Sequence, residues 1–493
     1  MEELSIELKN MEVSFQNKEV LWIEQLTAYQ NERIGVVGKN GQGKSTLLNV
    51  ISGELQPNSG TINRQVVFNY FHQVEEMDET KQAAELDSHI MGRLKVPNNA
   101  IETLSGGEET KFRLAQTLSL YQMGLLLDEP TTHLDRESVQ FLIEELRYYY
   151  GTLIVVSHDR YFLDQLVTKI WEVDKGTVQE YAGNYSAYVR QKEQEKSEQQ
   201  REFEKVSKEK KRLEQAVEQK KQQAQKISQV NEKQKKRAIR PDRLSSSKQK
   251  DTVQKNVQKT AKAMEKRIEQ LGKVEAFQET KEIRFPASEE LAIHNRFPIR
   301  GSDIDLYGGN KLLLKKANFQ FPLGKRIAII GENGSGKSTL LKSILSDGEG
   351  VTLSPKVVFG TYRQMAYKLT DSSSLLDYLM KQTDFSEKIV RSVLNNLGFS
   401  QMEIRKPLKS LSGGEATRIS MALLFIKPSN VLILDEPTNF IDIQTIKSLE
   451  KFMRGYPGTV IFTSHDQYFV DQAADQVWEI KNQEFSLIKG DPV

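Results

Sequence analysis

Residues 32–48 read ERIGVVGKNGQGKSTLL, and this short stretch decides the fold. It begins with apolar residues typical of a buried strand, continues through a glycine-rich turn, and ends in residues that start a helix. The turn, from Gly38 to Ser45, fits the pattern G-x-x-x-x-G-K-[ST]. Its glycines let several backbone N–H groups converge on phosphate oxygens, and the following helix adds the positive end of its dipole. The stretch therefore predicts a phosphate-binding loop at the end of a strand.

The same segments return later in the chain, in the same order. Residues 325–341 read KRIAIIGENGSGKSTLL, 293 positions after the first loop. Three further segments recur at an offset of 307: LSGGEETKFRLA (104–115) as LSGGEATRISMA (411–422), LLLDEPTTHLD (125–135) as LILDEPTNFID (432–442), and LIVVSHDRYF (153–162) as VIFTSHDQYF (460–469). Each half alternates short strands with helical stretches, which is typical of an α/β domain on a mostly parallel sheet. We expect two tandem P-loop ATPase domains.

Both loops contain the residue types that bind nucleotide phosphates and a metal ion. Lys44 and Lys337 would neutralise the β- and γ-phosphates. Ser45 and Ser338 would coordinate Mg²⁺. The nucleotide-binding residues expected in the loops are Gly38, Asn40, Gly41, Gly43, Lys44, Ser45 and Thr46 in the first half, and Gly331, Asn333, Gly334, Gly336, Lys337, Ser338 and Thr339 in the second.

Acidic pairs follow an apolar strand in each half. Asp128 and Asp435 suit a metal ion or its bound water. The adjacent Glu129 and Glu436 suit a base that orients the attacking water. His158 and His465 also end strands, where they would sense the γ-phosphate. Because ligands bind at the carboxyl ends of strands in such sheets, the pattern predicts two sites that hydrolyse ATP with Mg²⁺.

Composition excludes several other classes of protein. The chain of 493 residues has no cysteine, so it holds neither a disulfide nor a thiolate metal site. No apolar run approaches the roughly 20 residues that a membrane helix needs. The acidic N-terminus, MEELSIELKN, lacks the features of a signal peptide. We therefore expect a cytoplasmic protein without a membrane partner.

The segment between the repeats carries a strong excess of positive charge. From Arg190 to Lys273 it holds 26 basic and 13 acidic residues, although the whole chain has a net charge of only +2. Sparse apolar stripes (Val206, Leu213, Val217, Ala224 and Ile227; then Val253, Val257, Ala261, Met264, Ile268 and Leu271) predict two antiparallel helices that pack along one seam, as in a coiled coil. At 1.5 Å per residue, the arm would be roughly 40 to 70 Å long. The domains expected are residues 1–184, the linker 185–273 and residues 274–493.

The far end of this arm, near residues 233–250, is the most basic part of the chain. Positive side chains gather around a turn that contains Pro241, and Leu244 is apolar among them. Arg and Lys would contact RNA phosphates, and Leu244 would pack on a base or ligand unless it is an incidental loop residue. The expected contact residues of this tip are Lys236, Arg237, Arg240, Arg243, Leu244 and Lys248.

The paired motifs resemble those of the ATP-binding cassette (ABC) family, and the resemblance covers nearly all of both halves. LSGGE at 104–108 and 411–415 looks like that family's signature motif. In the family, two cassettes close head to tail, which implies one ATP between Lys44 and Ser412 and another between Lys337 and Ser105 within a single, monomeric chain. The resemblance also implies that the signature residues bind nucleotide: Ser105, Gly106, Gly107, Ser412, Gly413 and Gly414. It implies the same role for Asp135 and Asp442, and for the Q-loop residues Gln73 and Gln364, which would also bind Mg²⁺. Phe15 and Tyr307 would be the aromatic residues that stack on adenine.

Two cassettes joined by a charged helical linker, without a membrane span, resemble the ABC-F family. The run RAIRPDRLSSSK at 237–248 and the absence of a long insertion in the first half are similar to its antibiotic-resistance branch, and most of all to the Msr-type (macrolide–streptogramin B resistance) group. That resemblance implies an ATPase that binds the E site of the 70S ribosome, reaches rRNA and P-site tRNA, and displaces macrolide or streptogramin antibiotics. The alternatives are a housekeeping ABC-F factor that relieves stalled ribosomes, a DNA-associated ABC protein, and the ATPase subunit of a transporter.

Overall fold

The computed structural model describes residues 3–15, 18–73, 87–96, 106–236, 256, 259–260, 262–270, 283, 285–286, 290–362, 373–408, 413–439 and 441–490. The chain divides into two compact units. One contains residues 1–188 and 280–493, which hold both repeats, and the other contains residues 189–279.

Each repeat contains a six-stranded sheet, and the two sheets have the same order. In the first half the order is β5 (Phe68–Phe71), β6 (Gly124–Asp128), β7 (Thr152–Val156), β3 (Arg33–Val37), β8 (Lys169–Asp174) and β9 (Thr177–Ala182). In the second half it is β14 (Phe359–Tyr362), β15 (Val431–Leu434), β16 (Thr459–Thr463), β12 (Arg326–Gly331), β17 (Gln476–Lys481) and β18 (Glu484–Lys489). Among these described strands, only the last of each sheet pairs antiparallel. The predicted α/β class with a mostly parallel sheet is confirmed.

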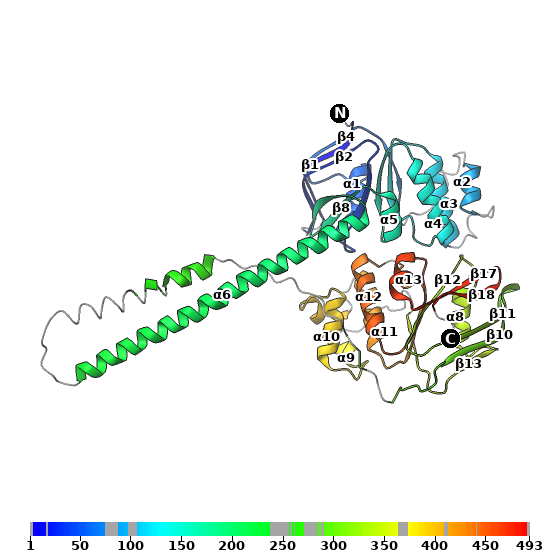
Figure 1. Ribbon diagram of the computed structural model, residues 1–493. Coiled ribbons are helices and arrows are strands. Elements are labelled where there is room, and N and C mark those ends of the chain that lie inside the picture. The colour runs from blue at the N-terminus through cyan, green and yellow to red at the C-terminus, as the bar shows by residue number, and fades with distance from the viewer. Residues whose placement is uncertain are drawn as a thin grey trace. The chain divides into compact units, whose positions relative to one another are not determined.

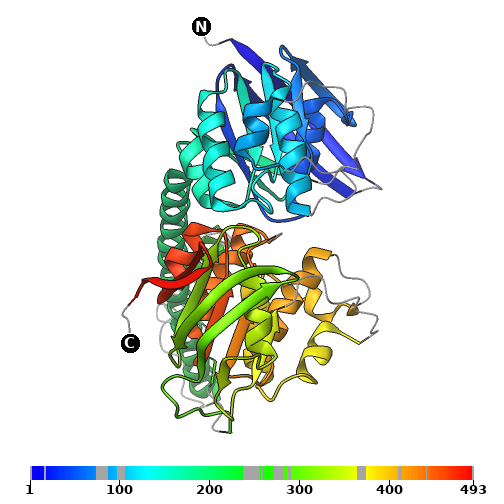
Figure 2. The ribbon, with the colours of Figure 1, turned by 90° about the vertical axis from the view of Figure 1, so that its right-hand side faces the viewer.

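A smaller antiparallel sheet accompanies each large one (Figure 2). Its strands are β2 (Lys18–Tyr29), β1 (Leu4–Phe15) and β4 (Ser59–Arg64) in the first half, and β11 (Lys311–Phe321), β10 (Ile299–Gly308) and β13 (Val351–Leu353) in the second. Apolar residues of this sheet, of the large sheet and of the first helix form one buried core in each half. The core fixes the large sheet from one side, so that its polar strand ends face the sites described below.

The helices follow the strands as the repeat predicts. They are α1 (Lys44–Ser52), α2 (Ser88–Arg93), α3 (Gly106–Ser119), α4 (Arg136–Tyr148) and α5 (Arg160–Leu166) in the first half, and α8 (Lys337–Leu345), α9 (Leu375–Met380), α10 (Glu387–Asn396), a short 3₁₀ turn (Glu403–Arg405), α11 (Gly413–Ile426), α12 (Ile443–Gly455) and α13 (Gln467–Ala473) in the second. Five of them begin with an aspartate that caps the free N–H groups of the first turn: Asp87 on α2, and Asp135, Asp159, Asp442 and Asp466 on the helices that follow strand ends. The last four caps place the start of each of these helices at a fixed point beside a strand end.

The linker begins with α6 (Tyr185–Lys236), a single helix of 52 residues and so roughly 80 Å long. Residues 262–270 form part of a returning helix. Ion pairs join the two, Lys221 to Glu265 at 2.8 Å and Arg267 to Glu209 at 3.6 Å. From Glu265 to Arg267 the residue numbers rise along the return helix, while those of their partners on α6 fall from Lys221 to Glu209. The two helices therefore run in opposite directions, and the predicted antiparallel pairing is confirmed (Figure 1).

The predicted seam agrees with the burial of the described side chains. Val206 and Leu213 are partly buried, Val217 is buried, and Met264 and Ile268 are partly buried on the return helix. The other side chains of the predicted stripes lie outside the described residues, as do Arg237, Arg240, Arg243, Leu244 and Lys248 and the side chain of Lys236. In the described part of the chain, no helix has the length and apolar character to cross a bilayer.

One packing difference between the halves concerns Gly35 in β3. A Cβ atom added there would lie 2.9 Å from Ile170 Cδ1 and 3.1 Å from Leu163 Cδ2. The corresponding residue in the second half is Ala328, which is fully buried, and the counterpart of Ile170 is Val477, which lacks a δ carbon. Space for a methyl group on the strand therefore depends on the size of the side chain on β8 or β17.

We expect Gly35→Ala to lower the free energy of unfolding by about 1–3 kcal/mol, because the added methyl group overpacks this contact. The further change Ile170→Val should recover most of the loss, since it recreates the pairing of the second half. Denaturant titration followed by the fluorescence of the buried Trp171 measures both effects. Gly92→Ala is the matched control, because a Cβ there meets no neighbouring atom. Equal stability of Gly35→Ala and the parent protein would contradict this account.

Candidate functional site

The two glycine-rich loops have the backbone shape that phosphate binding requires. Gly43 and Gly336 precede α1 and α8 with φ angles of 102° and 111°, in the left-handed region where other residues are strained. The Lys44 ammonium donates to the carbonyl oxygens of Gly38 at 2.9 Å and Lys39 at 3.2 Å. Lys337 does the same in the second loop, to Gly331 at 2.8 Å and Glu332 at 3.0 Å. Burial lowers the pKa of both lysines, each of which faces carboxylates at the strand ends.

A cavity of about 470 Å³ lies at the first loop and is lined by residues of both halves. From the first half come the predicted residues Phe15, Asn40, Gly41, Gly43, Lys44, Ser45, Thr46, Gln73, Asp128, Glu129 and His158. From the second half come Thr438, Asn439, Ile446, His465 and Asp466. The structure thus brings together most of the residues expected at this loop, and it places part of the opposite half against them.

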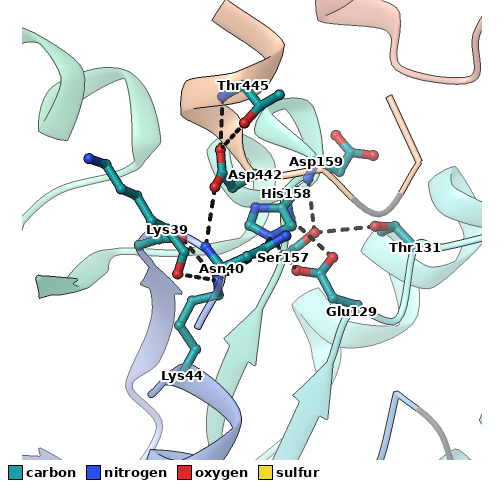
Figure 3. A network of polar contacts seen from close by, with 11 residues as sticks. Lys39, Asn40, Lys44, Glu129, Thr131, Ser157, His158, Asp159, Asp442 and Thr445 are labelled. Carbon is teal, nitrogen blue, oxygen red and sulfur yellow. Dashed lines mark hydrogen bonds and ion pairs between the residues drawn. The ribbon is translucent and has the colours of Figure 1, made fainter. Parts of the chain in front are cut away.

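A chain of polar contacts connects the two halves at this loop (Figure 3). His158 Nε2 lies 3.1 Å from the side-chain oxygen of Asn40, and the Asn40 backbone N–H donates to Asp442 of the second half at 3.2 Å. Asp442 also accepts from the Thr445 backbone N–H and hydroxyl, both at 2.8 Å. Burial alone would raise the pKa of Asp442, but these hydrogen bonds outweigh it and lower that pKa. A charged carboxylate from one half is therefore fixed on the phosphate loop of the other.

Glu129 lies beside this chain, at the end of β6. Its Oε2 accepts from the His158 backbone N–H at 3.2 Å, and its Oε1 lies 3.4 Å from His158 Nε2. Oε1 is buried and accepts no hydrogen bond from the described residues. Burial and the negative charge of Asp128 raise the pKa of Glu129 to about 8, and burial lowers the pKa of His158 to about 3. This arrangement gives a carboxyl group that titrates near neutral pH, held by a neutral imidazole.

The second half repeats the arrangement around Glu436. Its Oε2 accepts from the His465 backbone N–H at 3.3 Å, and its Oε1 lies 3.4 Å from His465 Nε2 without a hydrogen bond from the described residues. Burial raises the pKa of Glu436 to about 7 and lowers that of His465 to about 3. Both glutamates have a positive φ, 53° at Glu129 and 45° at Glu436. Non-glycine residues adopt this strained conformation mainly where function requires it.

The contact between the halves is different at the second loop. There Asn333 donates to the backbone carbonyl of His133 at 2.9 Å. Asp135, the counterpart of Asp442, is instead paired with Lys111 at 3.0 Å within its own half. Burial would raise the pKa of Asp135, but hydrogen bonds from Ser138 and the charge of Lys111 outweigh it and lower that pKa to about 2. The two loops therefore face different groups, although their sequences are repeats.

The strand-end aspartates also have different partners, which motif reading did not reveal. Burial raises the pKa of Asp128, and the nearby hydroxyls of Ser45 and Tyr70 oppose that rise. Asp435 accepts from the Thr463 hydroxyl at 2.8 Å. Alignment of the two halves would have flagged Thr463, because a valine occupies its position in the first half.

The donors around the first loop fit a magnesium ion that is bound together with a nucleotide. In the described part of the chain no cluster of three or more His, Asp or Glu residues could hold a metal ion alone. The Ser45 hydroxyl and the Asp128 carboxylate are nevertheless hard oxygen donors, which suit Mg²⁺ when phosphates and water complete its shell.

Some predicted residues are not placed by the structure. Ser105, Gln364 and Ser412 lie outside the described residues, while Gly106 with Gly107 and Gly413 with Gly414 begin α3 and α11. Phe15 lines the first cavity at the end of β1, and Tyr307 is 56% exposed on β10. Ser338 and Thr339 lie in the first turn of α8. The adenine contacts and signature contacts therefore stay predictions.

Comparisons with known proteins identify the domains. A family model described as "ABC transporter" matches residues 24–132 and 314–439, and a second model of that description matches residues 171–252. The chain is 46% identical over 98% of its length to an erythromycin resistance ATP-binding protein, MsrA, of Staphylococcus epidermidis, of which it covers 99%. It is 34% identical over 97% of its length to the ribosome protection protein VmlR of Bacillus subtilis, of which it covers 87%. Among solved structures, the RNase-L inhibitor aligns with a TM-score of 0.62 and 17% identity over 98% of this chain and 90% of its own, which shows a shared fold.

Proposed function

The chain belongs to the ABC-F family of ATP-binding cassette proteins and is an ATPase, and we propose that it protects the ribosome from macrolide-type antibiotics. The observation that carries this proposal is the 46% identity to an erythromycin resistance protein, which extends over both cassettes and the linker. The likeness to a ribosome protection protein over 97% of the chain points to the same target. The basic linker supports it, because arginine and lysine side chains suit an RNA surface.

We assign the roles at each ATP site from the contacts of its residues. Lys44 and Lys337 would leave the loop carbonyls to bind the β- and γ-phosphates. Glu129 and Glu436 would accept a proton from the attacking water, for which their buried Oε1 atoms are available. His158 and His465 would hold these carboxylates in place and, as neutral imidazoles, contact the γ-phosphate.

The same sites would hold Mg²⁺ with the nucleotide. Ser45, Gln73 and Asp128 would bind it or its waters in the first site, and Ser338, Gln364 and Asp435 in the second. Bound there, the ion neutralises charge on the transferred phosphate. The signature residues Ser105, Gly106, Gly107, Ser412, Gly413 and Gly414 would cover the nucleotide from the opposite cassette.

ATP binding would close the cassettes into the form that docks at the ribosomal E site. The linker would then reach P-site tRNA and the peptidyl transferase centre, with its basic residues on rRNA phosphates. Its tip would perturb the drug site so that macrolide or streptogramin antibiotics leave. Hydrolysis would open the cassettes and release the protein.

Replacing both glutamates, Glu129→Gln with Glu436→Gln, tests the cycle. We expect ATP hydrolysis to fall by roughly 10²–10⁴-fold, because a general base contributes a factor of this size. The variant should still bind ATP and should accumulate on ribosomes, measured by cosedimentation with 70S particles, and it should block growth. Glu144→Gln, at an exposed position, is the matched control. Release from ribosomes at the normal rate would refute the cycle.

The raised pKa values predict how activity depends on pH. A base must be ionised, and pKa values of about 8 for Glu129 and about 7 for Glu436 mean that both groups lose their protons as the pH rises through this range. We expect ATPase activity to increase from about pH 6.5 to about pH 8.5, by up to about tenfold per pH unit below the pKa. In single variants, the profile of Glu436→Gln, which retains Glu129, should rise at higher pH than that of Glu129→Gln. A flat or falling profile in a protein that stays folded would exclude these carboxylates as bases.

The linker tip is tested with Leu244→Ala. We expect weaker macrolide resistance in a sensitive host, because a side chain that packs near the drug site is shortened, and near-normal ATPase activity, because the cassettes are unchanged. Met402→Ala, which removes an exposed apolar side chain from the second cassette, is the control. Full resistance in Leu244→Ala would show that drug release does not depend on this side chain. Normal ribosome binding without resistance in the parent protein would instead favour a housekeeping translation factor.

A further inference from the structure

A buried ion pair joins the two cassettes away from the phosphate loops. Arg160 Nη1 lies 2.9 Å from Glu450 Oε1. Arg160 is 2% exposed and Glu450 is 8% exposed. The Arg160 guanidinium also lies over the Tyr468 ring, 4.9 Å from its centre. An arginine of the first cassette therefore contacts two residues of the second.

The repeat supplies this pair only once. At the offset of 307 that relates the halves, Gln467 corresponds to Arg160 and Ile143 corresponds to Glu450. A glutamine and an isoleucine cannot form an ion pair, so the pseudo-symmetric position has no equivalent contact. The asymmetry is a property of the sequence as well as of the structure.

The pair connects the two elements that meet at the Lys44 site. Arg160 is the first residue of α5 and follows His158 by two positions, with Asp159 as the helix cap. Glu450 lies on α12, which is capped by Asp442, the residue that accepts from the Asn40 N–H. Because helices are stiff over these lengths, fixing Arg160 to Glu450 restrains His158 and Asp442 together at the same loop.

The Lys337 site is built without such a pair. Its described contacts with the first cassette are the hydrogen bond from Asn333 to the His133 carbonyl and an exposed ion pair between Lys95 and Glu332 at 3.4 Å. Its helix-capping aspartate, Asp135, is paired with Lys111 of its own cassette. The two sites therefore differ in how firmly the opposite cassette is held against them.

The surroundings of the pair suit a positioning role better than a stabilising one. Arg160 Nε and Nη2 are buried without hydrogen-bond partners among the described residues, so the guanidinium is only partly satisfied. Buried ion pairs contribute little net stability, but they fix geometry, because separating the partners leaves an uncompensated charge. A pair of this kind resists opening at the point where it lies.

We propose that Arg160 and Glu450 are positioning residues that keep the Lys44 site aligned between the cassettes, and that their single occurrence makes the two ATP sites unequal. The Lys44 site stays closed around its trans-cassette carboxylate, while the Lys337 site opens more readily to exchange nucleotide. The proposal concerns ATP turnover and does not depend on ribosome binding. It does rest on the assignment of Glu129 and Glu436 as the bases of the two sites.

The test measures each site alone in the purified full-length chain. Glu436→Gln leaves only the Lys44 site active, and Glu129→Gln leaves only the Lys337 site active. A loss of ATPase activity in each of these single variants first checks the assignment of the bases. Adding Arg160→Gln, the residue of the other half, should lower turnover at the Lys44 site by about 10- to 100-fold, the range expected when reacting groups are misaligned. Turnover at the Lys337 site should stay unchanged.

Two further variants separate positioning from general damage. The charge reversal Arg160→Glu with Glu450→Arg should restore part of the activity at the Lys44 site. The double variant Arg160→Gln with Glu450→Ile reproduces the residues of the pseudo-symmetric position. It leaves no buried charge without a partner, so it tests the positioning role if Arg160→Gln alone fails to fold. That double variant should also lose activity only at the Lys44 site. Equal losses at both sites, or no loss at either, would overturn the proposal.

Discussion

Contact of each phosphate loop with the opposite half of the chain is the constraint on which the rest of the structure depends. The phosphate loop, the strand-end carboxylates and the histidine come from one cassette, because the parallel sheet brings its strand ends to one edge. The carboxylate of Asp442 on the Asn40 N–H comes from the other. Neither cassette alone provides both sets of groups, so the arrangement of the two cassettes becomes part of the chemistry.

The duplication preserves the fold but not the details of the sites. In one cassette the hydroxyls of Tyr70 and Ser45 lie near the strand-end aspartate, and in the other the Thr463 hydroxyl donates to it. Lys111 neutralises Asp135, whereas its counterpart Arg418 donates to the Leu397 carbonyl and leaves Asp442 for the opposite loop. Each of these differences lies in a side chain beside a motif, while the motifs themselves are nearly the same. Two sites of similar sequence therefore have different electrostatic surroundings.

Sequence patterns predicted the parts of the molecule that are local. The loops, the strand-end acids and the seam at Val206, Leu213 and Val217 follow from spacing within a few turns or strands, and the structure confirms the elements that carry them. The contact between Asn40 and Asp442 joins residues 402 positions apart, and only a resemblance to a known family suggested that the halves meet there. The Arg160–Glu450 pair was missed because, although Arg160 lies in the repeated segment 153–162, Glu450 belongs to no repeated segment and nothing in the sequence links the two residues. The difference between the halves at both positions was the signal that could have identified it.

The first turn of α6, where the linker begins, packs against the first cassette. Tyr188 donates from its hydroxyl to Glu172 of β8 at 2.7 Å, and its ring contacts those of Tyr181 and Tyr185. Tyr185 is buried, and the charges of Arg160 and Glu450 act on its phenol group. Along the rest of the linker the described ion pairs between its helices are exposed, so they add little stability, and few of its described side chains are both apolar and buried. The first turn of α6 is therefore packed more closely than the rest of the linker. It lies beside the same ion pair that joins the cassettes.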